Sequence, residues 1–556
     1  MLLLLQKHAQ RLVSLDLSHQ LGNVGSKIVT ERLMDFSTVR LLDLTACHID
    51  KSHSQLFKKS KIFGSNLTEL RLGGNTKLPI QELSEGLAKC QNLSCLDLSE
   101  VNLNTRALAA LSSVPHGFPH LRQVHFTSVT LTDVEDVQHL ESVLSRSTSS
   151  LTELHLGCFV GEYLNQGTGD LATCREIFKV ISKRTSLKVL ETAQLGVPVE
   201  MVIPFFEGIQ QLSCLEGLVL ERMNAVTTQT LPYLAQCLSH LVLLEKLVFR
   251  ECYSLKGGMS VIKDGLQHCT RLKVLDLFGC DLGPVDGPHL NEGLINCTSL
   301  VGLDLSYNFL RSQDIVPILA RNTGLVELLL CTFERNDTEL ASCLDACTAL
   351  NSLSIDGPMS SVPVPDSMGD IERPWTLDLD DPSIHQGHIL DCHSFLSSLQ
   401  QLKLQGFRLM PEKLEPVFLK AIKGCTELMS LTIMDCRISE EFVCQLAELI
   451  CNGELPKLSC LCLSQELPMF LETVGQEYYF KEDTGRRLEA MIKQHTTLTS
   501  LDLDLAPITS STRSLLLRAA TERTSNFCDV IVDCDTDEYA STASGDSEEE
   551  DSVEED

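Results

Sequence analysis

The chain has 556 residues, of which 43% are apolar but only 5% aromatic, so a large core has to be built from aliphatic side chains, mainly leucine. The net charge is −30; an acidic surface repels phosphate backbones, so nucleic-acid binding is disfavoured and basic proteins are the favoured partners. No segment reaches ~18 uninterrupted apolar residues, and residues 1–8 lack the basic start of a secretory signal. We therefore expect no membrane span and a cytoplasmic protein, with the nucleus as the alternative.

One pattern, Lxx-L-x-L, recurs along the chain at intervals of about 28 residues, inside the range of roughly 20–29 residues that is typical of leucine-rich repeats. Seventeen clear copies begin at Leu12, Val39, Leu67, Leu93, Leu121, Leu151, Leu187, Leu215, Leu244, Leu272, Leu300, Leu325, Leu350, Leu399, Leu428, Leu458 and Leu498. A weaker copy begins at Pro374, with Leu377 and Leu379 in phase, and brings the number to eighteen.

Each repeat predicts a strand followed by a helix. The alternating Leu272, Leu275 and Leu277 suit a short strand with one buried face, and residues 287–295 then have helical spacing. A single unit cannot bury its apolar face, but stacked units can. The sequence thus predicts an α/β leucine-rich-repeat solenoid (horseshoe) of about eighteen β-α repeats, with a parallel concave sheet and outer helices.

Cysteines follow the same repeat. One set lies three residues before a strand's first leucine, and another lies eight residues after it; the two sets are Cys90, Cys269, Cys297, Cys347 and Cys425, and Cys47, Cys252, Cys280 and Cys436. We interpret them as reduced, buried packing residues. The alternative, metal binding, would need clustered ligands such as CxxC pairs, and the sequence has none.

The expected solenoid covers residues 1–523, with irregular insertions near 157–175, 356–373 and 464–490. Residues 524–556 are strongly acidic and predict a disordered tail, in which Ser547 and Ser552 each precede an acidic residue by three positions, as in casein kinase 2 phosphorylation sites. The apolar run Leu2 to Leu5 stands where a polar cap is expected, which predicts self-association through an uncapped N-terminal end.

Two segments carry a family resemblance: residues 268–282, HCTRLKVLDLFGCDL, and residues 300–310, LVGLDLSYNFL. Long repeats with Cys or Asn in the turn resemble the ribonuclease-inhibitor class of leucine-rich repeats, which also forms the sensor region of NOD-like receptors. The resemblance covers roughly residues 1–520 and implies a protein-binding scaffold. Residues 22–27, GNVGSK, lack the order of a phosphate-binding loop, so the receptors' nucleotide-binding domain is not expected.

No catalytic motif, cofactor motif or metal motif stands out, so we expect no enzyme. His125 and His155 fall on outward strand positions, which we assign to units that are not adjacent, and we interpret the pair as ordinary surface histidines.

The strongest functional signal is a column of outward residues, one from each strand, between the second and third core positions. In chain order the column reads Asp16, Asp43, Arg71, Asp97, His125, His155, Glu191, Val219, Val248, Asp276, Asp304, Leu329, Ser354, Asp378, Lys403, Thr432, Cys462 and Asp502. Eight of the eighteen are acidic and two are basic, so the column predicts an acidic wall for a basic ligand. The alternative is that LDLS is simply a common sequence of this kind of repeat, so that the aspartates have no role in binding.

In the middle of the chain the column turns apolar, and Val274 and Phe278 lie beside it. An apolar centre with a charged rim is typical of protein interfaces. The predicted concave binding residues are Val189, Glu191, Val219, Val248, Asp276, Phe278, Asp304 and Leu329.

The sequence therefore predicts a non-catalytic interaction scaffold or sensor that binds a protein, in NOD-like-receptor-type innate immune signalling. Two alternatives stay open: a Ran-type GTPase-activating protein, and an acidic histone-binding leucine-rich protein.

Overall fold

The computed structural model describes residues 12–19, 33, 36–147, 149–160, 171–193, 199–223, 226–331, 338–356, 396–405, 414–434, 438–464, 482–503, 510–523 and 528–531. The chain divides into two compact units, unit 1 (Met1–Asn322) and unit 2 (Thr323–Asp556). The predicted N-terminal apolar run, the proposed phosphorylation sites Ser547 and Ser552, and most of the three predicted insertions lie outside the described residues.

Strands follow one another in chain order and pair in parallel within each unit. In unit 1 they are β1 (Ser14–Asp16), β2 (Leu41–Asp43), β3 (Glu69–Arg71), β4 (Cys95–Asp97), β5 (Gln123–Leu131), β6 (Glu153–Val160), β7 (Val189–Ala193), β8 (Gly217–Glu221), β9 (Lys246–Arg250), β10 (Val274–Asp276) and β11 (Gly302–Asp304). In unit 2 they are β12 (Glu327–Cys331), β13 (Ser352–Asp356), β14 (Gln401–Gln405), β15 (Ser430–Met434), β16 (Cys460–Ser464), β17 (Ser500–Asp502) and β18 (Asp529–Ile531).

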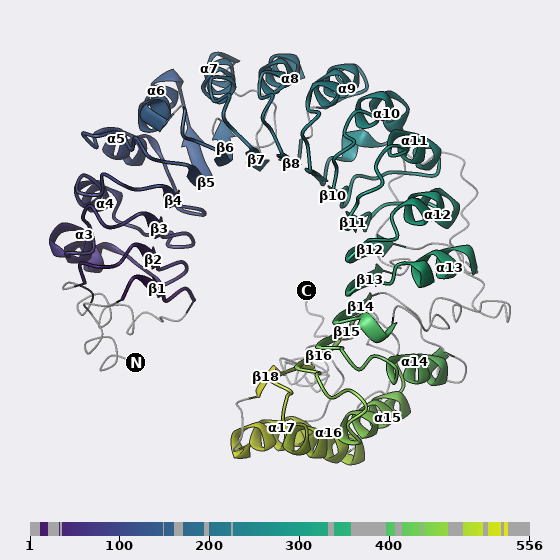
Figure 1. Cartoon of the computed structure of the whole chain (residues 1–556). Helices are drawn as coiled ribbons and strands as arrows, with labels where there is room; N and C mark the ends of the chain where they lie inside the picture. Colours follow the sequence, from purple (N-terminus) through teal and green to yellow (C-terminus); the bar gives the residue numbers. More distant parts are fainter. Residues whose placement is uncertain are drawn as a thin grey trace, which may run out of the picture. The chain divides into compact units, whose positions relative to one another are not determined.

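Helices alternate with these strands. Unit 1 contains α3 (Ser54–Lys59), α4 (Ile80–Leu87), α5 (Thr105–Ser112), α6 (Val134–Leu144), α7 (Leu171–Ser182), α8 (Val202–Gln210), α9 (Leu231–His240), α10 (Met259–Leu266), α11 (Gly287–Gly293) and α12 (Ser312–Arg321). Unit 2 contains α13 (Thr338–Ala346), α14 (Leu414–Ile422), α15 (Glu440–Cys451), α16 (Glu482–Gln494) and α17 (Ser510–Glu522). In unit 1 the strands line the inner, concave side and the helices lie outside (Figure 1), which confirms the leucine-rich-repeat solenoid.

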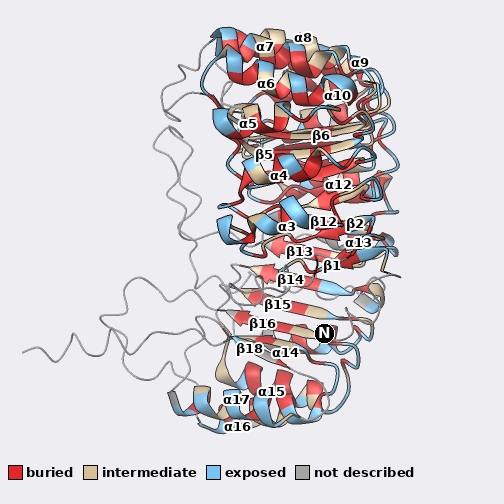
Figure 2. Ribbon diagram, turned by 90° about the vertical axis from the view of Figure 1, so that its left-hand side faces the viewer, coloured by how far each residue is buried: buried red, intermediate tan, exposed pale blue. Residues whose placement is uncertain are grey.

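The helices follow from their caps and their apolar spacing. Before α6, the Asp133 carboxylate accepts hydrogen bonds from the backbone amides of Glu135 and Asp136, so two otherwise unpaired donors are satisfied. Val137 and Leu140 then return on one face of the helix and are buried against the sheet side. Buried and exposed residues alternate around the outer helices in this way (Figure 2). Within the described residues, every helix is too short or too polar to cross a membrane.

The core is a ladder of leucines at equivalent repeat positions. Leu15, Leu42 and Leu70 are paired through neighbouring strands, and each is almost completely buried. The same repeat position is continued by Leu96, Val124 and later residues. Because each strand is short, most of its stability comes from burial against the strands on either side.

A second, polar ladder caps the backbone in the turn eight residues after the first leucine. The Cys47 thiol donates to the Leu17 carbonyl at 3.0 Å, and the Cys280 thiol donates to the Phe249 carbonyl at 3.0 Å. In another unit, the Asn75 amide donates to the Leu44 carbonyl at 2.9 Å. Several units have either Cys or Asn at this position, and both side chains can satisfy a buried carbonyl of the preceding unit.

Cysteines of the other register are buried as predicted. Burial raises the pKa of the Cys90 and Cys269 thiols to about 12. Their thiols therefore stay protonated at neutral pH, as expected of side chains that serve packing.

The structure of unit 2 bears on the sequence prediction at two places. Strand β13 pairs directly with β14, with Ser354 opposite Lys403. The weak repeat at Pro374 and its column residue Asp378 lie outside the described residues. Strand β18 pairs with β17, so the sheet continues beyond residue 523. A prediction from leucine spacing misses β18, because its apolar residues stand inside a strongly acidic segment.

Asn308 offers a direct test of the polar ladder. Its side chain accepts from the amides of Cys280 and Leu282 and donates to the Leu277 carbonyl at 2.7 Å, all of them buried. We expect Asn308→Ala to lower the free energy of unfolding by about 2–4 kcal/mol, because several buried backbone groups lose their partner. Asn308→Cys should cost clearly less, since Cys stands at this position in the preceding unit. Urea denaturation of the full chain measures both; equal losses would contradict the capping role.

Candidate functional site

The outward column predicted from the sequence exists in unit 1. Strand pairing places Asp97 beside His125, His155 beside Glu191, and Val248 beside Asp276. The remaining members, from Asp16 to Asp304, follow the same register. Side chains that are about 28 residues apart in the sequence therefore become direct neighbours on the concave face.

Several aspartates of the column accept hydrogen bonds from backbone amides of their own turn. The carboxylate of Asp43 accepts a hydrogen bond from the amide of Thr45 at 2.9 Å, and Asp97 does the same for Ser99 at 2.8 Å. Asp276 accepts from the amide of Phe278 at 3.0 Å. Each aspartate closes the turn that follows its own strand, a well-known use of this side chain. The recurring LDLS sequence thus has a structural cause, and one carboxylate oxygen of each aspartate already accepts a backbone hydrogen bond.

The predicted apolar centre is less accessible than expected. Val219 and Val248 are 4% and 3% exposed, although both belong to the outward column. Neighbouring strands lie only about 4.8 Å apart, so the flanking side chains cover a small valine. Val189 and Phe278 are half-buried on the same unit, and Leu329 is half-buried on unit 2. The two buried valines are therefore packing residues, and contact with a ligand has to come from their charged and aromatic neighbours.

Negative charge accumulates between β7 and β11. Burial, together with the nearby charge of Glu191, raises the pKa of the Glu221 carboxyl. Burial also raises the pKa of the Asp304 carboxyl to about 6, and Asp276 adds to this effect. Arg250 compensates part of the charge through an ion pair with Asp276 at 2.6 Å. The remaining carboxylates disfavour further negative charge on this part of the concave face and favour the binding of a cation.

An aromatic pair borders this acidic region. The rings of Phe278 and Tyr307 lie 4.7 Å apart, centre to centre, in the turns that follow β10 and β11. Tyr307 remains 37% exposed, and its backbone has a φ of 55°, which turns the chain sharply after the strand. Exposed aromatic side chains next to arginine and carboxylates are frequent anchors of protein interfaces.

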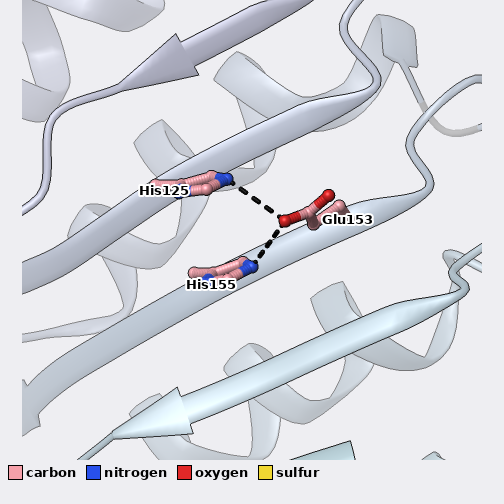
Figure 3. A group of neighbouring side chains, drawn as sticks. All are labelled: His125, Glu153 and His155. Carbon is pink, nitrogen blue, oxygen red and sulfur yellow. Dashed lines mark hydrogen bonds and ion pairs between the residues drawn. The ribbon is translucent and has the colours of Figure 1, made fainter. Parts of the chain in front are cut away.

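A second cluster lies on β5 and β6 (Figure 3). His125 and His155 are direct partners in the sheet, and their rings stack with 4.0 Å between centroids and 7° between planes. The assignment of these histidines to separated units is thus wrong, because the repeats that start at Leu121 and Leu151 are consecutive. Both imidazoles face Glu153, with Nε2 of His155 at 2.8 Å and Nε2 of His125 at 3.4 Å from Glu153 Oε1.

The two histidines have opposite electrostatic surroundings. Burial lowers the pKa of His125, and the charge of His155 lowers it further. Burial also opposes the charged form of His155, but the carboxylates of Glu191 and Glu153 outweigh it and raise its pKa. Glu191 Oε2 lies 3.0 Å from His155 Nδ1, so His155 has a carboxylate at each ring nitrogen.

Sequence reasoning missed Glu153. Glu153 stands two residues before the column residue His155, and the sequence prediction considered only the column position of each strand. Because side chains two apart on a strand share a face, Glu153 and His155 belong together on that face. Reading both outward positions of each strand would have found the group.

Comparison with known proteins returned no matching family model. Similar solved structures include an internalin from Listeria monocytogenes, at 15% identity and a TM-score of 0.34, covering 79% of this chain and 89% of that chain. Others are TLR13 in a complex with ssRNA13 (15% identity, TM-score 0.40, 84% of this chain, 60% of that chain) and Rad7 in the yeast Rad7–Elc1 complex (12%, 0.34, 88% and 89%). The repeats, the parallel sheet and the outer helices make this chain a leucine-rich-repeat protein.

Asp304 provides a test of the acidic region through pH. Its folded-state pKa of about 6 lies above the ordinary value of 3.8, so the folded protein holds this proton more tightly than the unfolded chain. The resulting stabilisation is complete below about pH 4 and is lost as the pH rises through about 6. Asp304→Asn removes this dependence while its amide oxygen can still accept from Ser306. At pH 7 we expect the variant to be more stable by about 1–3 kcal/mol, with the difference shrinking toward pH 5. Thermal unfolding between pH 5 and 8 measures this; parallel profiles would contradict it.

Proposed function

We propose that this protein is a non-catalytic interaction scaffold that binds a basic segment of another protein on the concave face of unit 1, between β7 and β11. The observation that carries the proposal is the pair of concave carboxyls, Glu221 and Asp304, whose pKa values are raised by burial and by neighbouring acidic groups. Burial is the main cause of both raised pKa values, and the neighbouring acidic groups Glu191 and Asp276 add to it, so a cation placed beside these carboxyls would stabilise their charged forms. A lysine or arginine from a ligand would supply that cation.

The remaining features of the region suit a protein ligand. The exposed ring of Tyr307, supported by Phe278, offers an apolar contact beside the charges. Arg250 is exposed and held in place by Asp276, so it can also receive an acidic group of the ligand. Aromatic and arginine side chains in a charged rim give both contact area and specificity. Long-range attraction from the acidic face would speed association at low salt.

The resemblance to the sensor region of NOD-like receptors supports a narrower proposal, recognition of a protein ligand in innate immune signalling. Two other activities fit an acidic leucine-rich-repeat protein: activation of a Ran-type GTPase and binding of histones. A GTP-hydrolysis assay with a Ran-type GTPase tests the first of these. Capture of purified core histones at graded salt tests the second. Histone capture that depends on the concave carboxylates would make a histone the basic partner.

Charge-neutral variants of the concave face test the proposal. The full chain is titrated into a fluorescent 12-residue peptide rich in lysine and arginine, at low and at physiological salt. We expect the double variant Glu221→Gln/Asp304→Asn to bind this peptide about tenfold more weakly, because two of the negative charges that attract the peptide to the concave face are lost. Wild-type binding should weaken as salt screens the charges over about 8–10 Å.

The matched control is Glu292→Gln. This change removes one carboxylate from the outer helix α11, where Glu292 is 52% exposed and pairs with Lys263. We expect it to bind the basic peptide as the wild-type chain does. If the control weakens binding as much as the concave variant, the attraction comes from net charge and the concave site is refuted.

A further inference from the structure

The histidine and glutamate cluster on β5 and β6 has the composition of a metal site. His125, Glu153 and His155 each offer one ligand atom, and these three atoms lie within 4.8 Å of one another. We propose that the three side chains bind a divalent transition metal ion of the zinc class, with one further coordination position open to the concave side. The three ligands lie on β5 and β6, outside the acidic region between β7 and β11, and the site does not depend on the proposed ligand.

The sheet brings all three ligand side chains together on one face before any ion arrives. Register places His125 opposite His155, and Glu153 lies two residues before His155 on the same face of β6. Zinc binds imidazole nitrogen at about 2.0–2.1 Å and carboxylate oxygen at about 2.0–2.2 Å, so tetrahedral ligand atoms lie about 3.3 Å apart. The distances of 2.8 and 3.4 Å from the two Nε2 atoms to Glu153 Oε1 bracket this separation. Ligands on neighbouring strands are held more rigidly than ligands on loops.

Outer partners orient the ligands as they do in metal sites. Glu191 Oε2 lies 3.0 Å from His155 Nδ1, which fixes a proton on that nitrogen and leaves Nε2 to face the cluster. The amide of Gln123 donates to the other carboxylate oxygen of Glu153 at 2.7 Å, so Oε1 is the oxygen presented to the two histidines. His155 thus has the Glu191 carboxylate at Nδ1 and the Glu153 carboxylate at Nε2. This arrangement stabilises a cation bound next to Nε2 and Glu153.

One nitrogen of the cluster has an ion-pair contact but no hydrogen-bond partner. Among the described side chains, Nε2 of His125 is buried without a hydrogen-bond partner, although it faces Glu153 Oε1. A buried polar atom without a partner is costly, and such atoms are rare in folded proteins. An ion bound between His125, His155 and Glu153 would satisfy this nitrogen as a ligand.

The composition of the site selects the class of metal. Two imidazoles and one carboxylate suit zinc, cobalt, nickel and copper better than calcium or magnesium, which prefer oxygen ligands. The side chains of His125 and His155 remain 25% and 18% exposed on the concave face, so water or a side chain of a bound protein can reach the ion. Two parallel stacked rings do not aim at one point, so each ring has to turn toward the ion when it binds.

Metal titrations of the full chain test the proposal. After treatment with a chelator under reducing conditions, the wild-type chain is titrated with Zn²⁺ in competition with a chromophoric chelator, and separately with Co²⁺ followed by absorption spectroscopy. We expect one tight site, with a cobalt spectrum of nitrogen and oxygen ligands that lacks the intense band of thiolate coordination. His125→Asn and Glu153→Gln should each weaken Zn²⁺ binding at least tenfold.

His289→Asn is the matched control, since His289 lies 3.7 Å from Glu292 on the outer helix α11 and thus forms a histidine–carboxylate pair of another kind. We expect this variant to bind Zn²⁺ as the wild type does. A second readout needs no variant: bound Zn²⁺ should protect His125 and His155 from modification by diethyl pyrocarbonate, as detected by peptide mass spectrometry. Unprotected histidines, a thiolate cobalt spectrum, or equal Zn²⁺ affinity in His125→Asn would each overturn the site. None of these outcomes bears on binding of the basic peptide.

Discussion

Parallel pairing between neighbouring repeats is the constraint on which the rest of this protein depends. Each strand is short, so it cannot hold its place alone, and the buried leucine ladder fixes it against the strands on either side. A shift by one residue would move the leucines to the solvent side, so the register is strongly determined. Once the register is set, every outward position of one repeat lies beside the same position of the next.

This constraint sorts the concave face into two kinds of surface. On β2, β4 and β10, an aspartate closes the turn after its strand, so part of the acidic column maintains the fold. On β5 and β6 the strands are longer and histidines stand in place of the aspartate. On β5 and β6, departure from the repeat sequence thus coincides with the histidine and glutamate cluster. Asp304 keeps the repeat sequence, and its carboxyl nevertheless has a raised pKa because it is buried.

The fold could be predicted from the sequence because leucine spacing alone specifies strand, helix and stacking. The outward column, from Asp16 to Asp304, was predictable for the same reason, since the repeat phase fixes which side chains face outward. Burial of Val219 and Val248 could not be read from the phase, because it depends on how far the neighbouring side chains reach over them. The stacking of His125 on His155 and the approach of Glu153 needed the actual strand pairs. Strand β18 was missed because its sequence has the composition of the acidic tail.

Hydrogen–deuterium exchange of the full chain, with and without the lysine- and arginine-rich peptide, tests most directly whether the concave face of unit 1 is the binding surface. The account predicts slower exchange in strands β7 to β11 and in the turns around Phe278 and Tyr307, with no change in the outer helices α9 to α12. Protection confined to those outer helices, or to unit 2, would contradict it.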